Sequence, residues 1–121
     1  MKLADFQVAH QRSGKLDDVL VHCWDDQKLV PAFVSREGLD DYFHSRAGLT
    51  TQQRNLVVDR NLDVFKRIIE NKYQSGECSI YSRLGYNYPR IDIELADIEQ
   101  DGEGLTDHVL EVARMAHFVE V

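Results

Sequence analysis

The side chains best suited to contact a partner lie in one ten-residue segment, 81–90. It contains the tyrosines Tyr81, Tyr86 and Tyr88 and the arginines Arg83 and Arg90. Tyrosine and arginine are enriched at the energetic centres of protein interfaces, and aromatic residues mixed with basic ones also stack nucleobases. The alternative is that the tyrosines pack over a sheet edge with their hydroxyls in water. These five residues are the first candidate binding residues.

A run of acids follows this segment directly. Residues 91–113 contain eight acids and no Lys or Arg, in a chain whose net charge is −7. An acidic patch can steer a basic partner, although a charge run is also an ordinary solvated surface. Four of these acids complete the predicted binding set: Asp92, Glu94, Asp97 and Glu99.

A second polar cluster, residues 22–26, places Cys23 beside His22. Such a pair invites a nucleophile-and-base reading. Adjacent strand residues, however, point to opposite faces of a sheet. The two side chains are therefore not expected to meet, and Cys23 is predicted to be a small core residue.

A third cluster has helical spacing. Asp40 lies four residues and Asp41 three residues before His44, which suits a metal site or an oriented imidazole, but also an ordinary surface pair. No third ligand is visible nearby in the sequence. His108 and His117 lie on opposite sides of a helix and cannot share a metal. We predict no metal, no cofactor and no catalytic residue, since nucleotide-binding glycine motifs, G-x-S-x-G and C-x-x-C are also missing from the sequence.

Length and composition set the frame for these residues. A chain of 121 residues with 43% hydrophobic residues has the size and composition of one globular domain, 1–121. No apolar run reaches the roughly 20 residues that span a bilayer. The first five residues carry no long apolar stretch, so we expect a cytoplasmic protein with both cysteines free.

Strand patterns dominate the first third of the chain. Phe6 and Val8 alternate with polar or small residues, and residues 19–24 are apolar on both faces, as in a central strand. A further strand is expected over 29–34. Because Pro31 cannot donate a ladder hydrogen bond, that strand is predicted to lie at an edge or to carry a bulge.

Two helices are expected next. Ser35 is a suitable N-cap for the first, which Gly48 ends. Thr50 and Gln53 have capping-box spacing and open a single long helix to about Ser75. Its apolar face is formed by residues at helical spacing: Val58, Leu62, Phe65, Ile69 and Tyr73.

The last third returns to strands. We expect a strand over 78–84, a loop over 85–89, and a strand over 90–98 in which Ile91, Ile93 and Leu95 face inward. A turn at 101–104 and a helix capped by Thr106 follow. The fold is predicted to be α+β, in the order β-β-β-α-α-β-β-α, with an antiparallel sheet covered by helices on one face.

One stretch resembles a known family. Residues 34–43, Val-Ser-Arg-Glu-Gly-Leu-Asp-Asp-Tyr-Phe, are similar to the I-S-x-E-x-L-x-x-x-F core of a family of short bacterial proteins of unknown function. In that family a strand pair feeds two helices, and Phe65, Arg67 and Glu70 resemble the pattern of its second helix in a different register. The resemblance covers about residues 19–73. It implies a fold and no activity.

These observations favour a binding or regulatory protein that presents residues 81–99 to a protein partner. A basic effector is the natural partner of an acidic inhibitor or immunity protein. One alternative is a small enzyme or ligand-binding domain in which Asp40, Asp41 and His44 join the Tyr/Arg segment around a pocket. Another is nucleic-acid binding, which the acidic net charge disfavours. The regular strand predicted over 91–98 leaves a homodimer open, and no membrane contact is expected.

Overall fold

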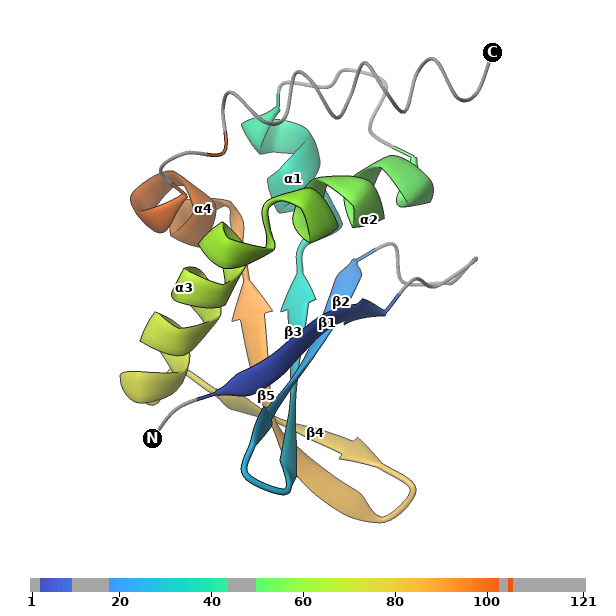
Figure 1. The fold of residues 1–121 in the computed structure, drawn as a ribbon, viewed down its shortest axis with the longest axis vertical. Helices are drawn as coiled ribbons and strands as arrows, with labels where there is room; N and C mark the ends of the chain where they lie inside the picture. The colour runs from blue at the N-terminus through green and yellow to red at the C-terminus, as the bar shows by residue number, and fades with distance from the viewer. Residues whose placement is uncertain (1–2, 10–17, 44–49, 103–104, 106–121) are drawn as a thin grey trace.

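The computed structural model describes residues 3–9, 18–43, 50–102 and 105. They form an α+β domain, as predicted (Figure 1). The strands are β1 (Ala4–Ala9), β2 (Val19–Asp25), β3 (Lys28–Val34), β4 (Ser79–Arg83) and β5 (Tyr86–Ile93). The helices are α1 (Arg36–Tyr42), α2 (Thr51–Arg60), α3 (Leu62–Gln74) and α4 (Leu95–Asp101).

The five strands form one sheet in the order β1-β2-β3-β5-β4. The β1–β2, β2–β3 and β4–β5 pairs are antiparallel, as short connections require. The β3–β5 pair is parallel, so the prediction of a purely antiparallel sheet is wrong. The reason is the crossover, since the chain passes through α1, α2 and α3 between β3 and the second hairpin.

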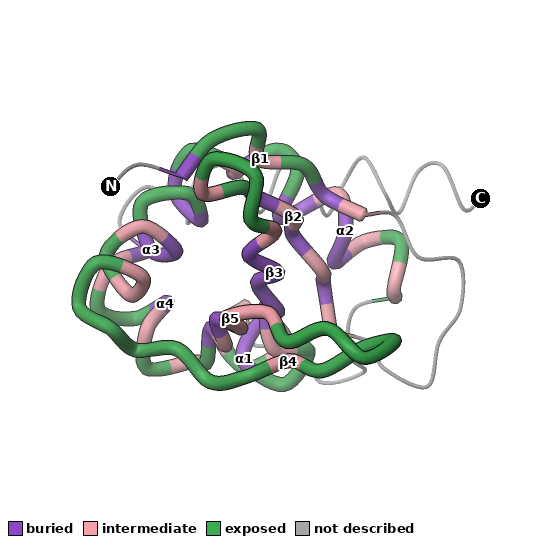
Figure 2. Tube along the Cα trace, turned by 90° about the horizontal axis from the view of Figure 1, so that it is seen from below, coloured by how far each residue is buried: buried purple, intermediate pink, exposed green. Residues whose placement is uncertain are grey.

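One face of the sheet carries the core. Val19, Val21 and Cys23 of β2 are fully buried with Phe65 and Ile68 of α3. The residues that alternate with them on β2 are half-buried or exposed. Figure 2 shows β3 buried at the centre and the β4 segment exposed along most of its length. The helices therefore cover one face, and the second hairpin extends beyond them.

The long predicted helix is divided into α2 and α3 at Asn61. This residue is almost fully buried, and its side-chain amide donates to the carbonyl of Val57, 2.8 Å away. The Asn61 carbonyl then accepts from the backbone of Val64 and Phe65 and starts a new helix. Asn61 keeps its own backbone bond to Val57 but leaves the helical conformation, with φ −112° and ψ 29°, and this is where the helix breaks. Its side-chain bond to the preceding turn stabilises that break.

The strand predicted over 90–98 ends at Ile93, and α4 begins at Leu95. The carboxylate of Asp97 accepts a hydrogen bond from the Glu94 backbone N–H at 2.9 Å, which caps the new helix. Ile98 is fully buried, three residues after Leu95, so the apolar spacing from there on is helical. This corrects the sequence prediction, which continued the strand alternation too far.

Other predictions fall outside the described residues. They are the second half of the predicted turn at 103–104 and the helix capped by Thr106. The predicted end of the first helix at Gly48 is wrong, since α1 ends at Tyr42 and Phe43 is its C-cap. Within the described ranges, no helix has the length and apolar character needed to cross a membrane.

Candidate functional site

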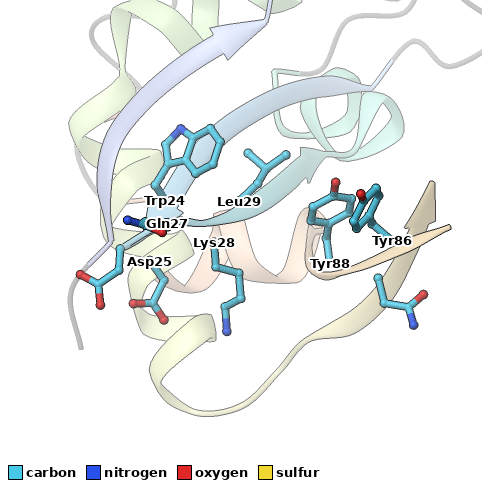
Figure 3. Close-up of a pocket in the computed structure, with 9 residues that line it drawn as sticks. Trp24, Asp25, Gln27, Lys28, Leu29, Tyr86 and Tyr88 are labelled. Atoms are coloured by element: carbon cyan, nitrogen blue, oxygen red, sulfur yellow. The ribbon is translucent and has the colours of Figure 1, made fainter. Parts of the chain in front are cut away.

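The two hairpins, β2–β3 and β4–β5, end on the side of the molecule away from the helices (Figure 1). A groove of about 740 Å³ lies between them. Residues 24–29, from the β2–β3 hairpin, form one wall, and residues 86–88 of β5 form the other. Figure 3 shows Trp24, Leu29, Tyr86 and Tyr88 pointing to the same side of the sheet, while Asp25 and Lys28 point away from it. The groove is thus apolar and aromatic on the uncovered face and charged on the other.

An aromatic row leads from the groove across the uncovered face. Ring centroids are 6.5 Å apart for Tyr86 and Tyr88, 6.4 Å for Tyr88 and Tyr81, and 5.6 Å for Tyr81 and Phe33. These separations lie within the range of favourable aromatic pairs. The guanidinium of Arg90 lies 4.0 Å from the Phe33 centroid. The row thus runs from the rim of the groove to Phe33, beside Arg90.

The groove exists because β3 and β5 separate after a short ladder. Their parallel register ends at Ala32 opposite Ile91, and the direction of the ladder is fixed by the bond from Ser35 N–H to the Ile93 carbonyl, 2.9 Å. If this register continued past Ala32 and Ile91, the next hydrogen-bonded ring between the two strands would need the backbone N–H groups of Pro31 and Pro89 as donors. Neither proline has one. Both hydrogen bonds of the ring are therefore missing at once, and the strands diverge.

This geometry corrects the prediction for β3. The strand is third in the sheet and pairs with β2 along its whole length without a bulge. Pro31 is accommodated because its nitrogen faces the fork with β5, where no ladder bond is made. The same register directs the carbonyls of Leu29 and Pro89 into the fork with no strand N–H opposite them. The fork consequently offers acceptors to a ligand.

The first wall is fixed to the helices by one long-range hydrogen bond. The hydroxyl of Tyr73 on α3 donates to the Asp25 carboxylate, 2.6 Å away. Burial, followed by this bond and the nearby carboxylate charge, raises the pKa of Tyr73 to about 12. The phenol therefore keeps its proton above pH 10, where an ordinary tyrosine loses it, and its bond to Asp25 links the hairpin to α3.

The second wall ends in a two-residue turn, Leu84–Gly85, in which both residues have positive φ, 53° and 81°. Two-residue hairpins favour Asn-Gly or Asp-Gly here, since a left-handed conformation is strained for most other side chains. Leu84 nevertheless occupies the first position. Its side chain is 87% exposed. The turn thus presents an apolar side chain at a conformational cost.

The structure brings part of the predicted binding set together. Tyr86 and Tyr88 line the groove, and Tyr81 and Arg90 belong to the adjoining aromatic face. Arg83 is exposed at the end of β4, next to the turn. The expected loop over 85–89 is wrong, since residues 86–89 belong to β5.

The predicted acids lie elsewhere. Asp92 is ion-paired with Arg90 at 2.7 Å, and Asp97 with Lys72 at 2.8 Å. Glu94 precedes α4, and Glu99 is exposed on that helix. None of these four acids lines the groove. Because Asp92 and Asp97 are paired with basic residues of the same chain, the acidic run offers less negative charge to a partner than the sequence indicates.

The other predicted clusters separate in the same way. Cys23 is buried, and its thiol donates to the Val30 carbonyl at 3.1 Å; burial and then the charge of Glu70 raise its pKa to about 12. Its role as a core residue is confirmed, and both cysteines are free. Asp40 is ion-paired with Arg54 on α2 at 3.3 Å. Neither Asp40 nor Asp41 lines the groove, and His44 lies outside the described residues.

The predicted binding set did not include the other residues that line the groove: Trp24, Asp25, Asp26, Gln27, Lys28, Leu29 and Asn87. It also did not include Leu84, in the adjoining turn. The sequence carried a local signal for the second hairpin only. Two runs separated by Leu84–Gly85, with Tyr86 and Tyr88 alternating after them, match a two-residue hairpin. Among the described residues, no three His, Cys, Asp or Glu side chains converge as a metal site.

Comparison of the chain with protein-family models, curated proteins and solved structures finds no match. The resemblance of residues 19–73 to a bacterial family stays a prediction.

Proposed function

We propose that this protein is a binding or regulatory protein that engages a protein partner through the groove between its two hairpins. The observation that carries this proposal is where its exposed apolar side chains lie. In the described part of the chain, four large hydrophobic residues are more than a third exposed, and all lie on these hairpins. Trp24 (37%) and Tyr86 (67%) line the groove, Leu84 (87%) lies at the adjoining turn, and Ile80 (74%) lies on β4, outside the groove. Clustered exposed apolar residues are characteristic of interaction sites.

The strained turn supports the same conclusion. A leucine with positive φ costs on the order of 1 kcal/mol relative to a residue that tolerates this conformation. Leu84 gains nothing in return within the described fold, because its side chain is almost fully exposed. A partner that buries this leucine accounts for its presence.

The backbone of the groove favours a particular kind of partner segment. The fork offers the carbonyls of Leu29 and Pro89, while both prolines lack an N–H. Aromatic faces and carbonyl oxygens bind cationic and N–H-rich groups well. We therefore expect a partner segment that carries Lys or Arg, in keeping with the acidity of this chain.

A protein partner is favoured over the two alternatives. Arg90, which lies on the aromatic face, is ion-paired with Asp92, so of the two arginines on this face only the exposed Arg83 is left to contact a phosphate backbone. An enzyme using Asp40 and Asp41 would need them near the groove, which they do not line.

The test is affinity capture by the tagged chain from a lysate of its source, with the variants Leu84→Asn and Tyr86→Ser and the control Gln52→Ala. Gln52 is exposed on α2, far in sequence from both hairpins. Asparagine suits the turn better than leucine, so Leu84→Asn should fold at least as stably as the parent chain. We expect parent and control to capture the same protein, and both hairpin variants to lose it at least tenfold.

Equal capture by the hairpin variants would reject the proposal. A second readout uses Trp24, the single tryptophan of the chain, whose fluorescence should shift when the captured partner is added. Micromolar binding of labelled single-stranded DNA or RNA at low salt, abolished by Tyr86→Ser, would instead assign the surface to nucleic acid.

A further inference from the structure

The outer edge of β4 has no neighbouring strand within the described residues. The sheet order ends at β4, whose five residues are exposed except for the half-buried Tyr81. An unpaired edge is a template for another strand, and proteins usually protect it with bulges, prolines or inward-pointing charges. Arg83, at its end, is the one charged residue of β4.

The opposite edge of the sheet differs in this respect. The β1–β2 register shifts between Ala4 and Gln7, and Asp5 has a φ of 58°. A bulge and an acidic residue at that edge oppose the addition of a strand. The two edges are therefore not equivalent, and β4 is the one built to accept a neighbour.

The register of the β4–β5 hairpin identifies the groups that would pair. In a two-residue hairpin the pair that closes the turn, Arg83 with Tyr86, is hydrogen-bonded, and bonded pairs alternate from there. Ile80 lies opposite Pro89, which cannot donate, in agreement with this alternation. The N–H and carbonyl groups of Ile80 and Ser82 consequently point outward.

The outward groups match an identical strand running the opposite way. With Tyr81 on a two-fold axis, Ile80 of each copy pairs with Ser82 of the other through their outward N–H and carbonyl groups, and all five residues of β4 find a partner. The two Tyr81 side chains meet in the closer, non-bonded position. Each Ile80, now 74% exposed, lies diagonally across from the other.

Charge complementarity supports the same register. It places Arg83 of one copy opposite Ser79 of the other, whose hydroxyl lies 3.4 Å from the Asp92 carboxylate. Glu77, also exposed, lies two residues before Ser79. The register therefore brings Arg83 of each copy toward the end of its neighbour that carries the exposed Glu77, while Asp92 is already paired with Arg90.

From this self-complementary edge we infer that a second copy of the chain docks on β4 and joins the two sheets into one ten-stranded sheet. The inference is independent of the proposed partner, because the groove lies on the other side of β5. Both grooves would face the same side of the joined sheet, which suits a partner with two binding segments.

Sedimentation equilibrium of the chain alone, between about 1 and 500 µM, tests the inference. A contact between two five-residue strands is small, so the dimer should form in a concentration-dependent way. We expect the mass to rise from 14.0 kDa toward twice that value. Ile80→Pro removes an outward N–H without removing a bond to β5, and should raise the dissociation constant at least tenfold. Ile80→Ala keeps that N–H and should have a smaller effect, and Ser82→Pro, at the other outward residue, should repeat the loss.

Circular dichroism and a thermal melt would verify that each proline variant is folded. A monomeric parent chain over the whole range would overturn the inference, as would a folded Ile80→Pro variant that dimerises like the parent. If the chain stays monomeric while Ile80→Pro loses the captured partner, the edge takes a partner's strand and the second copy is rejected. If the capture experiment rejects the proposed partner site, the mass measured for the chain alone still tests the dimer.

Discussion

At the scale of single residues, burial decides which reactive side chains are available for chemistry. Cys23 and Trp24 are neighbours in sequence, yet one is buried in the core and the other lines the groove. Alternation along β2 separates them. The same alternation keeps His22 away from the Cys23 thiol, so the pair has no geometry for nucleophilic catalysis.

The buried thiol predicts a loss of stability in alkaline solution. An unfolded thiol releases its proton above pH 9, while the folded Cys23 retains it up to about pH 12. The unfolded state binds fewer protons in that window, so the free energy of unfolding falls as the pH rises. Tyr73, with a folded pKa of about 12 against 10, adds to the fall above pH 10.

Denaturant unfolding between pH 8 and 11 would measure this effect, with Cys23→Ala and Cys78→Ser as the variant and its control. Cys78 is an exposed residue. The pKa of its thiol is also raised, mainly by partial desolvation. The fall between pH 9 and 10 should largely vanish in Cys23→Ala and persist in Cys78→Ser. A fall that survives in Cys23→Ala would contradict the assignment.

At the scale of elements, close contact between two short helices positions the chain after β5. Gly38 on α1 is buried against the start of α4, where an added Cβ would lie 2.9 Å from the Leu95 nitrogen. Lys72 and Arg67 of α3 hold α4 from the other side, through the Asp97 carboxylate and the Asp101 carbonyl. The position of α4 is thus set by neighbours distant in sequence.

Gly38→Ala should therefore destabilise the protein, against the usual preference of helices for alanine. Alanine gains about 0.5–1 kcal/mol over glycine within a helix, but overpacking costs about 1–3 kcal/mol. We expect a net loss of roughly 1–2 kcal/mol in the free energy of unfolding, measured by urea titration. Asp41→Ala, on the exposed side of the same helix, is the control and should change stability by less than about 0.5 kcal/mol. A stabilised Gly38→Ala protein would show that α4 can move away freely.

At the scale of the whole molecule, two prolines that are far apart in sequence act at one point of the sheet. Pro31 and Pro89 occupy the two positions whose N–H groups the next ring of the β3–β5 ladder needs. Either proline alone would leave one of the two bonds. Together they open the fork that separates the hairpins and gives the groove its width.

Replacing both prolines by valine should close part of this fork. In Pro31→Val/Pro89→Val, the two new amides should form the missing ring and become protected in hydrogen exchange followed by NMR. Each bond contributes about 1 kcal/mol, which the greater freedom of the unfolded chain offsets by about 0.4–1 kcal/mol per proline. Net stability should change little while partner capture falls. Unprotected amides at both positions would mean that side chains, and not prolines, hold the fork open.

The sequence alone determined what depends on local order along the chain. Alternation and capping patterns predicted the fold class, β1, β2 and the starts of α1 and α2, and the burial of Cys23, because these features involve residues within a few positions of each other. Residue type, the grouping of tyrosine with arginine, identified Tyr86 and Tyr88 as residues of interest.

The tertiary structure decided everything that depends on a crossover or a long-range contact. Two features join segments more than fifty residues apart: the parallel pairing of β3 with β5, and the groove that brings Trp24 close to Tyr86 and Tyr88. A third feature, the helix after Ile93, depends on contacts with residues distant in the sequence. No periodicity encodes which strand lies beside which. The proline pair illustrates the physical reason, since each proline has only a local effect in the sequence and the groove arises only when the sheet places their missing donors opposite each other.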